Sequence, residues 1–327
     1  MKLSSYNFVI ARSVATRQST YFIQWIATPS ARNDGCLSLA MTCLLCYNIP
    51  MTIREATDSD FPQLQEFLLP WECSCVTLCS HVRRKKENIY VITSGATLIQ
   101  GLLYLDKTLL YCIPDAANLP DLLPALTVFF QNKTISCLNG EAIAGQIILN
   151  ALQCMNRTPY QTNHYNIMTL ETQPLPPPED LSCDDEIKRC TDPDNDTELL
   201  LPLQKMYMAK EVAPQGKQVT DLEASAQLKS ILKDQLCFAL YSDGEIVSKA
   251  NTNAIGFNYV QLGGVYTHPL YRKNYYAWNL VYTICTRVLK TGRKISLFVK
   301  EKNNPAHQLY ERIGFTATGQ YMIAYFK

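Results

Sequence analysis

The chain has 327 residues, which is too long for one small core and indicates about two domains. Apolar residues make up 47% of the sequence, an ordinary share for a globular protein. The formal net charge is +1, so the charge of the whole chain is no indication of a nucleic-acid partner.

The charge is unevenly distributed along the chain. Residues 171–245 include 16 acidic and 7 basic side chains, whereas residues 250–327 include 10 basic and 2 acidic ones. A basic C-terminal part fits a small polyanionic ligand. It could also fit nucleic acid, but the sequence has no basic patch interleaved with aromatic residues and no nucleic-acid-binding motif. We therefore expect no nucleic-acid partner.

The 13 cysteines form no framework of pairs, and their odd number argues against a disulfide scaffold. A C-x-x-C at residues 43–46 stands alone. A second group lies close together: Cys73, Cys75, Cys79 and His81. A zinc site usually needs two well-spaced pairs of ligands, which this group does not provide. We interpret the cysteines as scattered buried thiols in a reducing cytoplasm, and we expect no bound metal.

Residues 1–50 differ from the rest of the chain. Residues 36–47 are an apolar run that is too short to span a bilayer and too far from the N-terminus for an ordinary signal peptide. Residues 9–19 and 27–35 resemble a translated bacterial intergenic repeat, and Met51 opens a convincing domain. We expect residues 1–50 to be disordered or a mis-assigned start. A membrane-associating N-terminal anchor is the alternative.

Residues 51–172 predict a first domain with alternating helices and strands. Asp58 and Asp60 can cap a helix that begins near Phe61. Apolar periodicity predicts strands at 52–56, 90–93, 98–105, 109–113, 135–138 and 167–170, and helices at 119–130 and 143–152. A linker at 173–183 comes next, and its Q-P-L-P-P-P-E-D cannot hold a helix or a central strand.

A short repeat relates the start of the first domain to the residues beyond the linker. Residues 53–60 read I-R-E-A-T-D-S-D, and residues 187–194 read I-K-R-C-T-D-P-D. Both fit I-[RK]-x-x-T-D-x-D before a leucine-rich helix. A strand before an Asp-capped helix is common, so chance is an alternative. Because both copies open a similar run of elements, we infer two related domains in tandem, with the second at 184–327.

The second domain predicts a clear order of elements. Helices are expected at 197–210, 222–232, 275–290 and 305–313, and strands at 186–190, 236–241, 245–253, 258–266, 294–299 and 320–326. Asp243-Gly244 marks a hairpin turn between two of these strands. Pro305 suits the first turn of the last helix, and Gly314 suits its end.

Residues 260–277, V-Q-L-G-G-V-Y-T-H-P-L-Y-R-K-N-Y-Y-A, predict a strand that turns into a helix. Gly263-Gly264 lets the strand bulge or splay where a ligand comes close to the backbone. Arg272 and Lys273 precede a helix whose free N–H groups face the same turn, and this combination favours phosphate. A plain basic turn is the alternative interpretation.

The order β-α-α-β-β-β-α-β-α-β, together with these residues and the segment N-N-P-A-H-Q-L-Y-E-R-I-G-F, resembles the GNAT superfamily of acyl-CoA N-acyltransferases. The resemblance covers residues 184–327 well and residues 51–170 by element order and the opening repeat. It implies a mixed α/β (α+β) fold of two tandem GNAT-like domains, each a mixed twisted sheet flanked by helices. The more specific motif, N-x-x-A-x-x-L-Y-E-x-x-G-F, matches at Asn303, Ala306, Leu309, Tyr310, Glu311, Gly314 and Phe315.

The resemblance also implies how a cofactor binds. In the family, a splayed strand and the following turn hold the pantetheine and pyrophosphate of acyl-CoA through backbone groups. It thus implies acetyl-CoA as co-substrate and an amine, on a small molecule or a protein, as acceptor. The cofactor-binding residues implied are Val265, Tyr266, Thr267, Arg272, Lys273, Asn274, Tyr275, Tyr276, Ala277 and Asn303.

One position departs from the family's turn motif, [RQ]-x-x-G-x-[GA]. Arg272 and Ala277 match it, but Tyr275 stands where glycine is usual. Glycine lets the backbone approach a pyrophosphate and adopt unusual dihedral angles, whereas tyrosine adds bulk and strain. Backbone N–H groups and the helix dipole survive the change, so we expect binding to be weakened rather than excluded. The ring could instead point outward along the adenine or the 3'-phosphate.

Tyr310 and Glu211 are the catalytic candidates. The resemblance implies that Tyr310 lies near the acyl-CoA sulfur and acts as general acid to the leaving thiolate. Its alternative is a packed aromatic beside Leu309. Many relatives carry a glutamate on the splayed strand, where this chain has Gln261, which cannot act as a base. Glu211, in M-A-K-E-V, is the candidate base; a surface carboxylate, or an acceptor deprotonated through water, is the alternative.

Two further features are open at the level of sequence. Lys249, Asn251 and Asn253 alternate on a strand and share one face, so they could line the acceptor cleft or a solvated or domain-facing surface. The first domain has an acidic turn without a cation at residues 113–118. We expect this half to be a degenerate domain that holds no CoA, with the halves related by a pseudo-two-fold axis.

The sequence thus predicts a cytoplasmic N-acetyltransferase that moves an acyl group from acetyl-CoA to an amine through a ternary complex. A catalytically silent acyl-CoA-binding or regulatory module is the alternative. We expect neither a membrane nor a nucleic acid as partner, and the sequence leaves the oligomeric state open.

Overall fold

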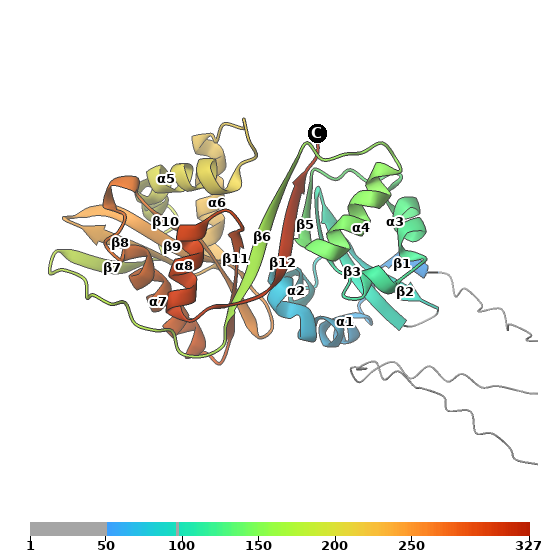
Figure 1. The fold of residues 1–327 in the computed structure, drawn as a ribbon, viewed down its shortest axis with the longest axis horizontal. Coiled ribbons are helices and arrows are strands. Elements are labelled where there is room, and N and C mark those ends of the chain that lie inside the picture. Colours follow the sequence, from blue (N-terminus) through green and yellow to red (C-terminus); the bar gives the residue numbers. More distant parts are fainter. Residues whose placement is uncertain (1–50, 96–97) are drawn as a thin grey trace, which may run out of the picture. The chain divides into compact units, whose positions relative to one another are not determined.

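The computed structural model describes residues 51–95 and 98–327, and the expectations for residues 1–50 lie outside this part. The described residues form one twelve-stranded sheet with helices on its faces (Figure 1). The strands are β1 Met51–Glu55, β2 Ile89–Ser94, β3 Leu98–Asp106, β4 Thr108–Cys112, β5 Cys137–Glu141, β6 Gln161–Leu170, β7 Asp185–Cys190, β8 Cys237–Ser242, β9 Glu245–Ile255, β10 Tyr259–Thr267, β11 Lys294–Lys300 and β12 Thr316–Tyr325. The helices are α1 Phe61–Leu68, α2 Val76–Arg83, α3 Leu122–Phe130, α4 Ala142–Gln153, α5 Asn195–Tyr207, α6 Asp221–Asp234, α7 Tyr276–Leu289 and α8 Asn304–Ile313.

The order of the strands repeats itself in mirror image. It runs β1-β2-β3-β4-β5-β12 and then β6-β11-β10-β9-β8-β7, so β1 to β6 occupy the places that β7 to β12 occupy in the other half. Within each half one pair is parallel, β4 with β5 and β10 with β11, and the other neighbours are antiparallel. The expectation of two tandem GNAT-like halves, each a mixed sheet flanked by helices, is confirmed.

The two halves exchange their last strands. β6, which ends the first half of the chain, pairs with β11 of the second half, with Leu170 opposite Ile295. β12, the last strand of the chain, pairs with β5 of the first half, with Tyr321 opposite Glu141. β6 and β12 also pair with each other and lie side by side at the centre of Figure 1. The division of the chain at residues 173–183 stays a prediction, because each half contributes a strand to the other.

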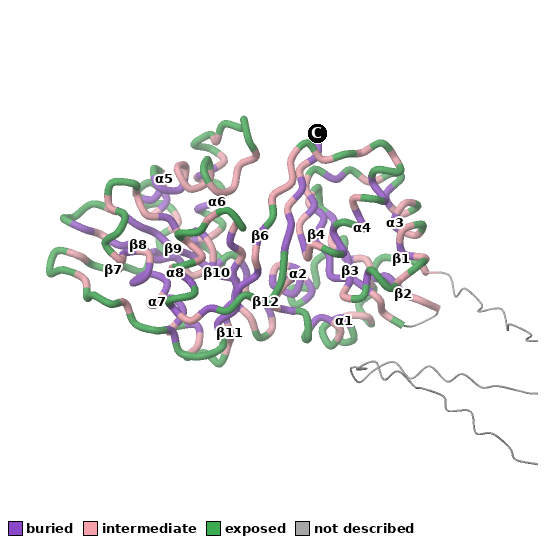
Figure 2. The backbone as a smooth tube through the Cα atoms, in the orientation of Figure 1, coloured by how far each residue is buried: buried purple, intermediate pink, exposed green. Residues whose placement is uncertain are grey.

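Separate apolar clusters lie on the two faces of each half. In the second half, α7 and α8 cover one cluster, and α5 and α6 cover another on the opposite face. In the first half, α3 and α4 cover one cluster, and α1 and α2 cover the other. Figure 2 shows the buried residues concentrated along the strands. Among the described residues, no helix is both long and apolar enough to cross a membrane.

The sequence missed one helix and placed the start of two strands, β6 and β12, too late. Helix α2 includes Cys79 and His81, Cys75 caps its N-terminus, and Cys75 and Cys79 are buried in the core of the first half. β6 begins at Gln161 rather than near residue 167, because its first residues are polar and gave no apolar alternation.

A buried carboxylate joins the halves away from the exchanged strands. Glu72, which is 1% exposed, lies in the 3-10 turn Leu69–Ser74 of the first half. Its oxygens accept the backbone N–H groups of Phe257, Asn258 and Tyr259, at 2.5, 2.9 and 3.0 Å, in the turn between β9 and β10. Burial raises the pKa of Glu72, and these three N–H groups act in the opposite direction. One side chain of the first half therefore fixes the start of β10.

Glu72→Ala should lower the free energy of unfolding by about 2–5 kcal/mol, because three shielded N–H groups lose their acceptor. Urea unfolding measures this difference. Glu66→Ala, on the exposed side of α1, is the matched control and should change the stability by less than about 0.5 kcal/mol. Equal effects of the two substitutions would contradict the anchoring role of Glu72.

Candidate active site

β10 and β11 part in the middle of the second half. Their parallel pairing runs from Tyr259 opposite Lys294 to Leu262 opposite Leu297 and then stops. Beyond that point, β10 continues beside β9 to Thr267, while β11 continues beside β6 to Lys300. The splayed strand expected from Gly263-Gly264 is confirmed. The backbone of β10 from Gly263 to Thr267 thus has no strand partner on its β11 side.

Side chains of β9 lie directly against both glycines at the splay. The register of β9 and β10 shifts between Gly263 and Tyr266, which marks a bulge. Gly264 has φ +60°, and a Cβ atom there would lie 1.7 Å from Asn251 Oδ1. A Cβ atom on Gly263 would lie 2.1 Å from Asn253 Nδ2. A side chain at either position would force these amides to move, and at Gly264 it would also be strained by the positive φ.

The expected phosphate turn leads from β10 into α7. A single 3-10 turn, Pro269–Tyr271, precedes Arg272, whose Nε donates to Thr267 O at 3.3 Å and whose guanidinium lies 5.7 Å from the Tyr266 ring centre. Lys273 has φ +72° and is exposed, as are Arg272 and Asn274. Two exposed cations therefore lie beside the N-terminus of a fourteen-residue helix.

Tyr275 takes the backbone conformation that glycine favours. It caps α7 with φ 54° and ψ 10°, in the left-handed region. Its half-buried ring packs on the core cluster and meets Trp278 edge to face, with the ring centres 6.3 Å apart. Trp278 Nε1 in turn donates to Leu175 O in the proline-rich segment at 3.0 Å. The ring is thus turned toward the core, and this contact compensates for the strain of a left-handed tyrosine.

The next two residues open the helix. Tyr276 is buried, and its hydroxyl hydrogen-bonds to Ser242 Oγ at 3.0 Å and Asp185 Oδ1 at 3.1 Å. Ala277 follows in the first turn of α7. Tyr276 therefore holds the helix on the sheet by its side chain, and only its backbone is left for a ligand.

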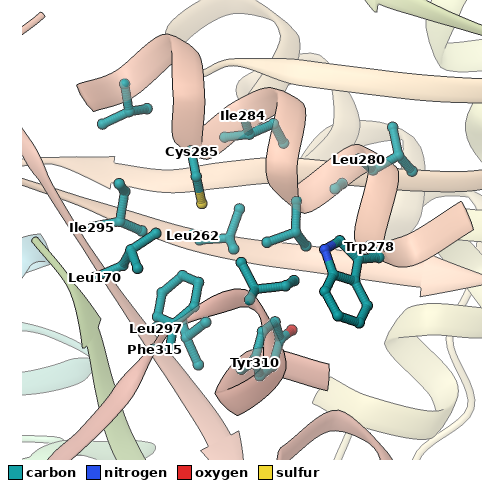
Figure 3. Close-up of a cluster of buried hydrophobic side chains, with 14 of the residues drawn as sticks. Leu170, Leu262, Trp278, Leu280, Ile284, Cys285, Ile295, Leu297, Tyr310 and Phe315 are labelled. Atoms are coloured by element: carbon teal, nitrogen blue, oxygen red, sulfur yellow. The ribbon is translucent and has the colours of Figure 1, made fainter. Parts of the chain in front are cut away.

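Asn303 and Tyr310 lie at the two ends of α8. Asn303 caps the helix, with Oδ1 accepting the N–H of Ala306 at 3.3 Å. Tyr310 is buried and meets Phe315 edge to face, with ring centres 5.6 Å apart. Figure 3 shows Tyr310 at one edge of the core cluster of the second half. Burial raises the pKa of the Tyr310 hydroxyl, with smaller contributions from Tyr207, Cys285 and Glu211.

The charge of Glu211 acts on two tyrosines, Tyr207 and Tyr310. It belongs to a π-helical turn, Met208–Val212, that continues α5. Its Oε2 pairs with Lys300 Nζ at the end of β11, at 3.3 Å. Burial raises the pKa of Tyr207 to about 12, and the charge of Glu211 adds to the shift, as it does for Tyr310. The charge of Glu211 thus acts on the Tyr310 hydroxyl, although no hydrogen bond joins these two catalytic candidates among the described residues.

The sequence did not identify Tyr207 or the burial of Lys249. Lys249 is fully buried on β9, and its Nζ donates to Gly264 O and to Asn251 Oδ1, both at 3.0 Å. In the sequence, the alternation of polar residues on β9 was the only feature that drew attention to Lys249. Gln261, at the place where many relatives carry a glutamate, accepts from Thr77 Oγ1 of the first half at 3.1 Å. It is a contact between the halves.

In the first half the corresponding splay is closed by a side chain. β4 and β5 pair in parallel only from Thr108 to Leu110, the counterpart of the pairing of β10 with β11. The next residue, Tyr111, is buried, and its hydroxyl donates to Glu141 O on β5 at 2.9 Å. Its ring lies against Gly140, where a Cβ atom would be 2.4 Å from it. The ring thus bridges the two strands at the place where the second half has Gly263.

Metal ligands do not gather anywhere in the described part of the chain: no three of its histidine, cysteine, aspartate and glutamate side chains are arranged to hold an ion.

Similarity to known proteins agrees with this geometry. Residues 203–315 match the model of the acetyltransferase (GNAT) family. A protein from Drosophila melanogaster has a TM-score of 0.60 at 14% identity, over 84% of this chain and 98% of that chain. A tandem GNAT protein from the clavulanic acid biosynthesis pathway has a TM-score of 0.52 at 12% identity, over 84% and 97%. A GCN5-related N-acetyltransferase from Sphaerobacter thermophilus has 0.52 at 15%, over 84% and 94%.

No curated protein matches the chain. The structural likenesses, all below 25% identity, show a shared tandem fold. The family match lies in the half that contains the splayed strand and the turn. Residues 203–315 are therefore similar to the acetyltransferase (GNAT) family, and the rest of the described chain shares the tandem fold of these structures.

Proposed function

We propose that the protein is an N-acyltransferase that moves an acetyl group from acetyl-CoA to an amine in a ternary complex. The observation that carries this proposal is the parting of β10 and β11 after Leu262, next to a turn with two exposed cations and a helix N-terminus. The parted strand offers backbone groups to pantetheine. The turn offers cations and N–H groups to the pyrophosphate.

The proposed contacts fall in order along the chain. Backbone groups of residues 265–267 bind the acyl and pantetheine part. Arg272, Lys273 and the N–H groups of residues 274–277 bind the pyrophosphate. Asn303 supports the pantetheine from the start of α8, where its side chain already caps the helix. The acceptor enters from the side of Glu211, and the basic balance of residues 250–327 favours the polyanionic cofactor over a cationic partner.

Proton transfers complete the reaction. The amine nitrogen attacks the thioester carbonyl, the tetrahedral intermediate expels the CoA thiolate, and the amine gives up one proton to Glu211 or to water. Tyr310 donates a hydrogen bond to the leaving sulfur. Because burial raises the pKa of Tyr310 still further above that of a thiol, stabilising the developing thiolate fits this hydroxyl better than full proton transfer does. For Glu211 to act as base, its carboxylate must either break its ion pair with Lys300 or accept the proton while it remains paired.

The direct test has two stages. Titration with acetyl-CoA by calorimetry measures binding, and thiol release with a panel of small amines and peptide amines measures turnover. Binding followed by thiol release supports the proposal. Binding without release on any amine would favour a silent acyl-CoA-binding module instead, and no binding at millimolar acetyl-CoA would overturn both.

The many free thiols favour a cytoplasmic location, which cell fractionation under reducing conditions would test.

Tyr310→Phe should lower kcat by about 100-fold and leave the KM for acetyl-CoA within about threefold, since the hydroxyl acts on the leaving group. Steady-state kinetics with the best acceptor measure both constants. Tyr111→Phe removes another buried hydroxyl, in the first half, and is the control that should keep kcat. An unchanged kcat in Tyr310→Phe would show that the tyrosine is only a packed aromatic.

Tyr275→Gly should leave the affinity for acetyl-CoA within about threefold, because the backbone conformation is already the one that glycine adopts and the ring is turned to Trp278. Calorimetry measures the dissociation constant. Lys273→Gly also places glycine at a position of positive φ, but it removes no packed ring. It should weaken binding, because it removes a cation. Binding that is tenfold tighter in Tyr275→Gly would show instead that the ring obstructs the turn.

A further inference from the structure

Lys249 is the one lysine of the described residues whose side chain is completely buried. It lies on β9, and its Nζ makes two hydrogen bonds of 3.0 Å, to Gly264 O in the bulge of β10 and to Asn251 Oδ1. The Tyr207 ring covers the ammonium, with its centre 5.1 Å from Nζ. A charge in such a place is costly unless it is bound, so the contact with the bulge needs an explanation.

The bulge residue is held through its carbonyl. Gly264 O accepts from Lys249, whose ammonium the Tyr207 ring at the end of α5 covers. The side chain of Asn251, which also binds Lys249, occupies the space where a Cβ atom of residue 264 would lie. Lys249 and Asn251 of β9 therefore fix one peptide at the point where β10 leaves β11, and Tyr207 of α5 covers the Lys249 ammonium.

We propose that Lys249 is a positioning residue for acyl-CoA, whose ammonium holds Gly264 so that the backbone of residues 265–267 faces the splay in a single conformation. This inference rests on the proposed function. The bond to Gly264 O is charge-assisted while Lys249 is protonated, and a neutral amine would make a weaker one. The hold on the bulge therefore depends on the charge of Lys249.

Burial lowers the pKa of Lys249 to about 8, while the nearby Cys237 and Cys190 act in the opposite direction. The other titratable groups that face Lys249 are the hydroxyl of Tyr207 and the thiols of Cys237 and Cys190. Burial raises the pKa of Tyr207 to about 12, so its hydroxyl stays neutral in the same range. Cys237 of β8 lies opposite Cys190 of β7; this neighbouring thiol lowers the pKa of Cys237, and the Lys249 ammonium lowers it further. A test must therefore separate the titration of these two thiols from that of Lys249.

The test is acetyl-CoA affinity as a function of pH, by calorimetry between pH 7 and 9.5. Acetyl-CoA has no free thiol, so the ligand does not lose a thiol proton in this range. In the wild-type protein, affinity should fall by about tenfold as Lys249 loses its proton. Lys249→Met should bind about tenfold more weakly at pH 7, with no further fall at higher pH.

Two controls separate charge and thiol effects. Lys229→Met removes an exposed lysine that pairs with Asp194, and it should reproduce the wild-type curve. Cys237→Ala removes the neighbouring thiol and should keep the fall above pH 7. A fall that disappears in Cys237→Ala would assign the titration to the thiol and overturn the role of Lys249.

A second measurement does not depend on binding. Because the folded pKa of Lys249 is below its unfolded value, the unfolded chain binds more protons between about pH 8 and 10.5, and wild-type stability should rise with pH there relative to Lys249→Met. If Lys249→Met does not fold, a wild-type affinity that is flat from pH 7 to 9.5 still overturns the inference. Absence of acetyl-CoA binding at every pH would instead overturn the proposed function.

Discussion

The second half depends on a single constraint at Gly264. β10 must stay bonded to β9 and yet leave β11 after Leu262, and a regular strand cannot do both. The bulge solves this conflict because two glycines allow the amides of Asn251 and Asn253 to lie directly against the backbone. Everything proposed for the cofactor depends on this point: the open backbone of β10, the direction of the turn and the start of α7.

The exchange of strands explains how the parted strands remain stable. A β11 that leaves β10 would expose an unpaired edge, and such edges invite association with other chains. Here β6 of the first half pairs with the other edge of β11, from Leu170 opposite Ile295 to Tyr165 opposite Lys300, and so keeps β11 in the sheet after it leaves β10. Glu72 holds the opposite end of β10 from the same half. The first half therefore supports the splay from two sides, although Tyr111 closes its own counterpart of the splay.

The sequence predicted the elements that show a clear period or a specific motif. The hairpin at Asp243-Gly244, the splay at Gly263-Gly264 and the end of α8 at Gly314 were all recognisable, because each depends on a residue type with a local physical role. The exchange of β6 and β12 was not, since two related strands carry similar apolar patterns and sequence does not state their neighbours. Helix α2 was missed because cysteine, serine and histidine gave it no apolar stripe.

Two residues show why a motif alone could not describe the site. Tyr275 breaks the glycine pattern of the turn, yet it retains the left-handed conformation because Trp278 and the core hold its ring. Lys249 looked like one of three polar residues on a strand face, but α5 covers it, and only the packing of Tyr207 turns an ordinary lysine into a buried charge. In both cases a tertiary contact determines the backbone on which the cofactor would lie. The conformation of the splayed strand is therefore set by its neighbours on β9, α5 and the first half, and not by the turn motif that first identified it.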